Sequence, residues 1–227
     1  MTSTKKKIIV DLLRHGEPEG GEILRGRIDP VLTSLVWQQM RRATAIIAED
    51  SVSSLTPLWT HILSSPLQRC RDFAEHVAQH TALDLCVDQC WQEIDYGDWD
   101  GMPLGEWRQQ AAAQFKEFRK DLSKLAPPNG EDFLSFRDRV LGAWQSLSAL
   151  ADGSHVLLVT HGGVMRVLLP TVLGMPLNRS FPLHIPFACF SRVQLEIDRD
   201  QISASLRFHN AATYESGPPP ASGPPPL

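Results

Sequence analysis

Two short apolar segments of the chain each lead into a histidine that is followed by glycine. The first leads into Arg14-His15-Gly16, and the second into His161-Gly162-Gly163. Residues 8–13 and 155–160, which precede these motifs, have the length and composition of buried β-strands. If the two strands are parallel in one sheet, both histidines emerge at the same edge, and the glycines let another group approach the backbone closely. The sequence therefore predicts a site that contains both histidines.

Two arginines are expected beside these histidines. Arg14 directly precedes His15, and Arg69 falls in the first turn of a helix that follows a predicted strand over residues 59–63. A cation near a helix N-terminus is disfavoured by the helix dipole, but an anion bound there reverses that cost. Arginine also binds phosphate oxygens through two parallel hydrogen bonds. The crevice is therefore predicted to bind a phosphoryl group, although an ordinary salt bridge is the alternative for Arg69 taken alone.

The remaining elements alternate between strands and helices. Short strands are predicted over residues 85–87, 193–197 and 202–208. One helix is predicted to be capped by Thr33 and to run to about Glu49, and another to run from Ser65 as N-cap and Pro66 as first residue to about His80. Further helices are predicted over 104–120 and 131–150. A last helix begins with Val164 to Leu169, and Pro170 kinks or ends it. This alternation predicts an α/β fold with a mainly parallel sheet covered on both faces. Such sheets bind ligands beyond the carboxyl ends of their strands.

A carboxyl group near the histidines is needed if an alcohol leaves during phosphoryl transfer, because the departing oxygen requires a proton. Glu93 follows the strand predicted over residues 85–87, so we expect it near the same edge of the sheet. The other acids of this loop, Asp95, Asp98 and Asp100, are interpreted as solvated surface carboxylates. Glu17 is the rival proton donor, because it lies two residues from His15.

Composition and charge exclude several classes of protein. A length of 227 residues suits one α/β domain, or at most two small ones. The net charge of −4 argues against a nucleic-acid-binding protein, because a phosphate backbone requires a basic face. No stretch approaches the ~20 apolar residues of a membrane span. Asp11 interrupts the apolar run after Lys5, Lys6 and Lys7, which favours a strand over a signal peptide.

Metal binding and disulfides are both weighed against the residue pattern. The two histidines have no acidic ligand at an evident spacing, and an arginine beside a metal cation is electrostatically unfavourable. Cys86 and Cys90 lack a second pair of ligands for zinc. The four cysteines form no disulfide framework, which predicts reduced thiols in a cytoplasmic protein. We therefore expect neither a metal nor another cofactor.

Four motifs in order resemble those of the histidine phosphatase superfamily, also called phosphoglycerate mutase-like. They are Leu13-Arg14-His15-Gly16-Glu17, Ser64-Ser65-Pro66-Leu67-Gln68-Arg69, Glu93-x-x-x-Gly97-x-Trp99-x-Gly101 and Thr160-His161-Gly162-Gly163. The resemblance runs from about Ile8 to Leu206. It implies a three-layer αβα sandwich with a mostly parallel sheet of about six strands. It also implies a small phosphorylated metabolite as the substrate.

The resemblance assigns a role to each matching residue. His15 looks like the nucleophile that accepts the phosphoryl group. Glu93 looks like the proton donor, and Glu17 follows the motif without a certain role. The phosphate pocket is implied to consist of Arg14, Arg69, His161 and Gly162.

Within the superfamily, further segments are similar to α-ribazole phosphatases of cobalamin biosynthesis. They are Arg14-His15-Gly16-Glu17-Pro18, Arg25-Gly26-x-x-Asp29-Pro30 and Pro128-Asn129-Gly130-Glu131. Arg25 and Gly26 are accordingly candidate site residues. The paired arginines typical of mutases are missing from residues 101–126. A phosphoglycerate mutase and a catalytically silent phospho-ligand binding module are the alternatives to a phosphatase.

Two segments depart from the family pattern, and one segment lies outside it. Leu32-Thr33-Ser34-Leu35-Val36 replaces the usual LTxxG, and Asn129-Gly130-Glu131-Asp132 replaces the usual Gly-Gly-Glu-Ser. The phosphatase domain is expected over residues 1–212. Residues 213–227 are rich in proline and glycine and are expected to form a solvated tail, with a proline-rich ligand for another protein as the alternative.

Overall fold

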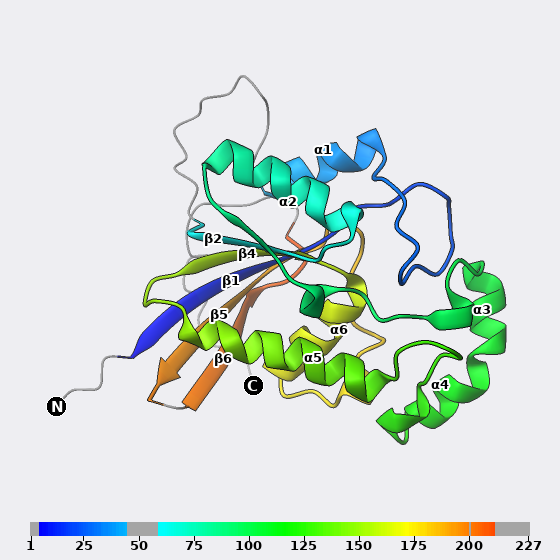
Figure 1. The fold of residues 1–227 in the computed structure, drawn as a ribbon. Coiled ribbons are helices and arrows are strands. Elements are labelled where there is room, and N and C mark those ends of the chain that lie inside the picture. The colour runs from blue at the N-terminus through cyan, green and yellow to red at the C-terminus, as the bar shows by residue number, and fades with distance from the viewer. Residues whose placement is uncertain (1–4, 45–58, 200, 212–227) are drawn as a thin grey trace, which may run out of the picture.

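A six-stranded sheet organises the chain in the computed structural model, which describes residues 5–44, 59–199 and 201–211 (Figure 1). The strand order is β3-β2-β4-β1-β5-β6. Strands β3, β2, β4 and β1 pair in parallel, whereas β5 and β6 are antiparallel to their neighbours. The strands span Lys6–Arg14 (β1), His61–Ser64 (β2), Leu85–Val87 (β3), His155–Thr160 (β4), Phe190–Asp198 (β5) and Gln201–Phe208 (β6).

Helices cover both faces of this sheet, so the expected three-layer α/β fold is confirmed. Helices α1 (Ser34–Ala43) and α2 (Gln68–Thr81) lie on one face, and α5 (Phe133–Ser146) and α6 (Gly162–Val172) lie on the other (Figure 1). The alternation of side chains along the strands produces two apolar cores. Val10 and Leu12 pack in the core beneath α5 and α6, whereas Leu13 packs in the core beneath α1 and α2.

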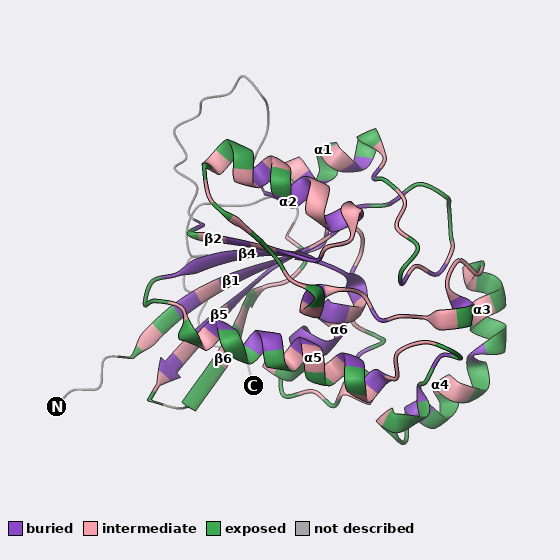
Figure 2. Ribbon diagram, viewed as in Figure 1, coloured by how far each residue is buried: buried purple, intermediate pink, exposed green. Residues whose placement is uncertain are grey.

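Two further helices lie beyond the sheet. They are α3 (Leu104–Gln110) and α4 (Ala112–Phe118), on the side where the chain leaves β1 (Figure 1). Most of their residues are exposed, unlike those of the central strands (Figure 2). These helices therefore stand beside the edge of the sheet where a ligand is expected.

Several predicted helix boundaries were wrong. Helix α2 begins at Gln68, so Ser65 is not its N-cap and Pro66 is not its first residue. Of the two effects expected of Pro170, a kink or a stop, the stop is wrong, because α6 continues to Val172. The helix predicted over 104–120 is divided at Ala111 into α3 and α4. The helix predicted over 131–150 begins at Phe133, because the Asp132 side chain accepts hydrogen bonds from the backbone N–H groups of the first turn.

The helix that follows Thr33 begins as predicted, with the Thr33 side chain accepting a hydrogen bond from the Val36 N–H. It ends at Ala43, and the rest of the predicted helix to about Glu49 lies outside the described residues. The predicted tail over 213–227 also lies outside them. In the part of the chain that is described, no helix has the length and apolarity needed to cross a membrane. All four cysteines are free thiols, of which Cys70 and Cys189 are buried.

Asp11 of β1 is fully buried and binds side chains from neighbouring segments. Its carboxylate accepts hydrogen bonds from Trp59 Nε1 at 2.8 Å and from Arg192 Nε at 2.7 Å, and it lies 2.8 Å from His155 Nε2. Burial alone would raise the pKa of Asp11, but the hydrogen bonds from His155 and Arg192 lower it below its ordinary value. The charge that interrupts the apolar run is thus paired inside the fold.

Candidate active site

The two histidines of the His-Gly motifs lie side by side at the carboxyl edge of the sheet. Strands β1 and β4 are parallel neighbours, with Arg14 paired to Thr160, so His15 and His161 follow at matching positions. The His15 N–H donates to the Thr160 carbonyl at 2.9 Å. The two imidazole rings are 5.2 Å apart between centroids, and both are buried. The parallel pairing expected from the sequence is therefore confirmed.

The hydrogen bonds of His15 define its tautomer. Its Nδ1 lies 2.7 Å from the carbonyl oxygen of Gly16, and a carbonyl can only accept. Nδ1 must therefore carry a proton, which leaves the lone pair of Nε2 available in the neutral ring. Burial, followed by the charges of Arg69 and Arg14, lowers the pKa of His15 well below its ordinary value. The fold thus maintains His15 as a neutral base with a free Nε2.

His161 is held in a similar neutral state. Its Nε2 lies 2.7 Å from the hydroxyl oxygen of Ser65, a residue that the sequence had placed only as a helix cap. Burial, then Arg69 and His15, lower the pKa of His161 well below its ordinary value. A dianionic phosphoryl group would supply the negative charge that this cluster of cations and imidazoles lacks.

We expect the imidazoles of His15 and His161 to remain neutral well below pH 6.5 in the folded protein. In the unfolded chain they take up protons near their ordinary pKa of about 6.5. Because the folded pKa is lowered, the stability of the fold is highest above about pH 6.5 and declines as the pH falls below it. NMR titration of the assigned imidazole signals, with the urea-unfolded chain as the reference, measures this directly. Titration of both residues near pH 6.5 in the folded protein would contradict it.

Arg69 is fully buried and held in place by the loop that follows β1. Its guanidinium donates to the carbonyls of Gly26 at 2.8 Å and Ile28 at 2.9 Å, and it pairs with Asp29 at 3.1 Å. The salt bridge considered for Arg69 therefore exists, and the positive charge of Arg69 also lowers the pKa values of His15 and His161. Among the described residues, its Nε–H has no hydrogen-bond partner.

Asp29 performs the capping that the sequence had assigned to Ser65. Its carboxylate accepts a hydrogen bond from the Gln68 N–H at 2.5 Å, in the first turn of α2. A residue from the loop after β1 thus fixes the start of α2 and, through it, the position of Arg69. Asp29 belongs to the segment that resembles α-ribazole phosphatases and that also contains Arg25 and Gly26. Its place in this segment was the sign in the sequence that Asp29 has a role.

Arg14 approaches the start of α6 from the end of β1. It donates to the Ile185 carbonyl at 2.6 Å, and its guanidinium lies 4.1 Å from the centroid of the Phe187 ring. A Cβ atom on Gly162 would stand 3.2 Å from this guanidinium, so a glycine keeps the approach open. The Nε–H of Arg14 is buried and has no partner in the described part of the chain. Each of the two arginines therefore retains an N–H group that could donate a hydrogen bond to a phosphate oxygen.

Glu93 is fixed at the N-terminus of α6. Its carboxylate accepts hydrogen bonds from the Gly163 N–H at 2.9 Å and from the Ile94 N–H at 3.0 Å. A Cβ atom on residue 163 would overlap this carboxylate, which explains the second glycine of the motif. Glu93 also acts electrostatically on Arg14. The structure thus brings Glu93 to the same crevice as His15.

Arg139 holds the backbone that carries Glu93, a role the sequence did not indicate. Its guanidinium forms two hydrogen bonds with the Glu131 carboxylate, at 2.7 and 2.8 Å. It also donates to the carbonyls of Gln92 at 3.0 Å and Glu93 at 3.1 Å. Glu131 belongs to the segment that departs from the family pattern, so the structure gives that segment a supporting position behind the Glu93 loop.

The secondary site candidates line the entrance. Glu17 is exposed and stands on the pocket wall, as does Arg25, which donates to the carbonyls of Glu19 and Gly21. Gly26 packs so closely that a Cβ atom would lie 2.6 Å from the Ile94 carbonyl. Gly26 therefore lies behind the wall, where its carbonyl accepts from Arg69.

The interpretation of the loop acids as solvated surface carboxylates holds for Asp98, which is exposed, and was wrong for Asp95 and Asp100, which are half-buried. Asp100 is half-buried and accepts hydrogen bonds from the N–H groups of Gly26, Arg27 and Ile28, at 2.7 to 2.8 Å. Asp95 pairs with Arg27 at 2.9 Å, and the exposed Asp98 accepts from the Asn129 side chain. These carboxylates join the Glu93 loop to the loop after β1 and to residues 128–130.

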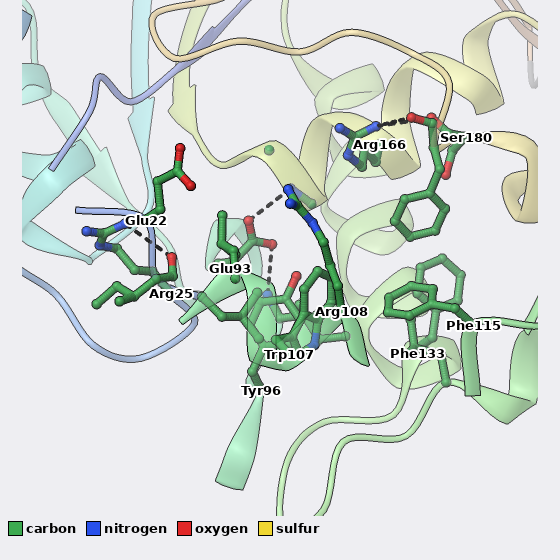
Figure 3. Close-up of a pocket in the computed structure, with 18 of the residues that line it drawn as sticks. Glu22, Arg25, Glu93, Tyr96, Trp107, Arg108, Phe115, Phe133, Arg166 and Ser180 are labelled. Atoms are coloured by element: carbon green, nitrogen blue, oxygen red, sulfur yellow. Dashed lines mark hydrogen bonds between the residues drawn. The ribbon is translucent and has the colours of Figure 1, made fainter. Parts of the chain in front are cut away.

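A cavity of about 820 Å³ opens beside these groups (Figure 3). Arg14, His15, Glu93 and Gly162 form part of its wall, whereas the fully buried Arg69 and His161 lie behind it. Within the described residues, no group of three or more histidine, cysteine or acidic side chains has an arrangement suited to a metal ion. One end of a large cavity is thus formed by an imidazole, a guanidinium group and a carboxyl group, with a second guanidinium and a second imidazole buried behind them.

This combination of fold and motifs is that of a known family. Residues 10–206 match the family described as "Histidine phosphatase superfamily (branch 1)". The chain belongs to this superfamily.

Individual relatives differ in name and length. A Mycobacterium tuberculosis protein named "Bifunctional protein Rv2228c" is 30% identical over 205 residues, which cover 89% of this chain and 54% of that protein. The chain thus spans about half the length of the first curated relatives it matches. The Proteus mirabilis "Probable phosphoglycerate mutase GpmB" is 31% identical, covering 82% of this chain and 85% of that protein. The crystal structure of the α-ribazole phosphatase from Shigella flexneri is similar in fold, with a TM-score of 0.71 and 24% sequence identity. The match covers 92% of this chain and 99% of that chain.

Proposed function

We propose that the chain hydrolyses phosphomonoesters through a phosphohistidine formed on Nε2 of His15. The proposal is carried by the state of His15, a neutral imidazole whose Nε2 keeps its lone pair. The charges of Arg69 and Arg14 act on this ring, and the Nε–H of each arginine has no hydrogen-bond partner among the described residues. The imidazole requires an electrophilic atom to attack, and the arginines require a group that bears negative charge. A phosphoryl group meets both requirements. The substrate class is a small phosphorylated metabolite.

The reaction proceeds in two steps. His15 Nε2 attacks phosphorus and forms an N–P bond, while the bond from phosphorus to the alcohol oxygen breaks and Glu93 gives its proton to that oxygen. Arg14, Arg69 and His161 stabilise the other phosphoryl oxygens as charge redistributes. Water then attacks phosphorus, Glu93 accepts its proton, and inorganic phosphate leaves as the N–P bond breaks. The two N–H groups that bind the Glu93 carboxylate suit the anion present between these steps.

A hydrolase is favoured over the two alternatives. A mutase must return the phosphoryl group to a small phosphorylated acid, whereas the cavity of about 820 Å³ suits a much larger alcohol. The paired arginines of mutases are also missing from residues 101–126. A silent binding module would have no use for a nucleophile with a carboxyl group beside it. α-Ribazole 5′-phosphate, from cobalamin biosynthesis, is the specific substrate that we propose, on the similarity of residues 14–18 and 25–30 to α-ribazole phosphatases.

We expect release of inorganic phosphate from phosphomonoesters without any added metal. Guanidinium groups, rather than metal ligands, neutralise the phosphoryl charge in this site. The measurement is phosphate release from α-ribazole 5′-phosphate, glucose 6-phosphate and ethyl phosphate after exhaustive chelation, beside an assay for phosphoglycerate interconversion. Interconversion without net release would identify a mutase. Loss of all activity on chelation, restored by a divalent cation, would contradict metal independence.

A further inference from the structure

The cavity extends far beyond the groups that handle a phosphoryl group. Its volume of about 820 Å³ lies within the ~300–1,000 Å³ typical of sites that enclose a whole small organic molecule. In Figure 3, Phe115 and Phe133 lie together at one end, Glu22 and Arg25 lie at the other, and Glu93 lies between them. The end marked by Phe115 and Phe133 is called the aromatic end below.

The aromatic end is built from rings contributed by separate elements. Trp107 of α3 and Phe115 of α4 are 5.2 Å apart between ring centroids, and Phe115 is 5.1 Å from Phe181 of the loop after α6. Phe133 of α5 and Tyr96 of the Glu93 loop complete the wall. Edge-on packing of this kind leaves ring faces and edges available to a further ring.

These rings are more than the core of the helices that carry them. Phe118, which touches the same cluster, is fully buried and does not line the cavity. Phe181 in contrast is 42% exposed, and Phe115 and Trp107 are half-buried. What distinguishes Phe181 from other exposed apolar residues such as Ile202 is that its ring lines the cavity, where a ligand could cover it. Arg166 fixes this exposed ring in place, since it donates to the carbonyls of Ser180 at 3.1 Å and Leu183 at 2.9 Å, on either side of Phe181.

Trp107 supplies a second, polar indication of a ligand. Its Nε1–H is buried, and among the described residues it has no hydrogen-bond partner. Buried donors of this type are normally satisfied. An acceptor atom attached to a bound ring system would satisfy it. The charged residues that this part of the chain adds to the cavity wall are cations: Arg108 of α3, Lys116 of α4 and Arg119 directly after α4. Among the described residues, α3 and α4 place no acidic side chain on the wall that would repel a phosphorylated ligand.

We propose that the aromatic end is a binding site for the alcohol part of the substrate, and that this alcohol carries an aromatic ring. The inference rests on the proposed phosphomonoester hydrolysis and specifies its substrate class. The phosphoryl group binds at His15, Arg14 and Arg69, and the ring of the leaving alcohol packs against Trp107, Phe115 and Phe181. An alcohol without a ring is disfavoured, because it would leave the ring surfaces of Trp107, Phe115 and Phe181 uncovered.

The test compares phosphates of primary alcohols that differ only in the group attached to the CH₂ that carries the phosphate ester oxygen. Ethyl, cyclohexylmethyl, benzyl and 2-naphthylmethyl phosphate all release a primary alkoxide, so the chemical step is matched. We expect kcat/KM to rise about 10²-fold from ethyl to 2-naphthylmethyl phosphate, because the ring buries apolar surface in the transition state. We expect benzyl phosphate to exceed cyclohexylmethyl phosphate by about 3- to 10-fold, because ring–ring packing adds to apolar burial.

Substitutions in the wall of the aromatic end test whether these residues cause the preference for a ring. Phe181→Ala removes an exposed ring and should lower the ratio of kcat/KM for 2-naphthylmethyl over ethyl phosphate by about 10-fold. Phe115→Leu keeps an apolar side chain and should lower the benzyl over cyclohexylmethyl ratio. Ile202→Ala, at an equally exposed apolar residue of β6 away from the cavity, is the matched control and should leave both ratios unchanged. Thermal unfolding of each variant monitors the fold.

A binding measurement makes the outcome independent of turnover. Calorimetry with 2-(2-naphthyl)ethylphosphonate and with ethylphosphonate, each in competition with inorganic phosphate, should show the same preference for the ring. Equal kcat/KM and equal affinity across the series would overturn the aromatic site while leaving the hydrolase intact. Ring-dependent phosphonate binding without phosphate release from any ester would sustain the aromatic site and overturn the proposed hydrolysis.

Discussion

Replacing His15 by alanine is expected to abolish both turnover and incorporation of phosphate into the protein. The loss should exceed the ~10²–10⁴-fold typical of removing an acid–base group, because the atom that forms the bond to phosphorus is removed. Rapid quenching of the wild-type protein with ³²P-labelled substrate should trap a phosphate that is labile in acid and stable in base. The same experiment on His15→Ala should trap none.

Two further variants serve as controls for this result. His15→Asn keeps a polar side chain of similar size at a buried position, so a loss of labelling there is not caused by a cavity. His184→Ala alters an exposed histidine outside the cavity and should label like the wild type. Labelling of His15→Ala at the wild-type level would place the phosphoryl group on another residue.

The part of the site that the sequence revealed is the part encoded by regular structure. His15 and His161 each follow a strand, and parallel pairing of two such strands leaves little freedom in where the next residue lies. The position of Arg69 was also predictable, although by a helix start that proved wrong by two residues. Both positions depend on short-range patterns, which a single sequence displays directly.

The parts that were missed depend on contacts between distant segments. Asp29 caps α2 from 39 residues away, and Asp100 binds the Gly26 N–H across 74 residues. A local pattern such as Ser-Ser-Pro predicts a cap next to the helix, and it gives no sign that a loop carboxylate takes that place. The role of Arg139 was missed for the same reason, since it holds the Glu93 loop through backbone carbonyls, which any sequence provides.

The aromatic end of the cavity shows a further limit of sequence reasoning. Trp107, Phe115 and Phe133 occupy helix positions where apolar residues ordinarily form a core, so their spacing predicts burial rather than a ligand. Their partner Phe181 follows α6 in a loop with no regular pattern. Only the placement of α3 and α4 beside the edge of the sheet makes these residues one wall (Figure 1).

The second large effect is expected for Glu93→Gln, in which the proton donor is lost and the shape of the side chain is kept. The amide oxygen of glutamine can still accept from the Gly163 N–H, so the variant tests chemistry more than position. An alkyl phosphate must have its departing oxygen protonated, because an alkoxide is a strong base. Its phosphorylation step should therefore slow by ~10²–10⁴-fold.

Nitrophenyl phosphate provides the contrast that identifies the role. A nitrophenolate leaves with little help from an acid, so the phosphorylation step with this substrate should be much less affected by Glu93→Gln. Hydrolysis of phosphohistidine then becomes limiting, because the same residue accepts the proton from water, and the phosphorylated protein should accumulate. Single-turnover kinetics with ethyl and nitrophenyl phosphate separate the two steps.

Glu17→Gln is the matched variant for this experiment, since Glu17 also lines the cavity and is the rival acid. If Glu93 is the donor, Glu17→Gln should slow alkyl and nitrophenyl phosphates by the same small factor. Equal slowing of both leaving groups by Glu93→Gln would instead mean that this residue supports the start of α6 or positions the phosphoryl group. A leaving-group dependence found only in Glu17→Gln would identify Glu17 as the proton donor. Its exposed position leaves Glu17 free to approach the alcohol from the entrance of the cavity.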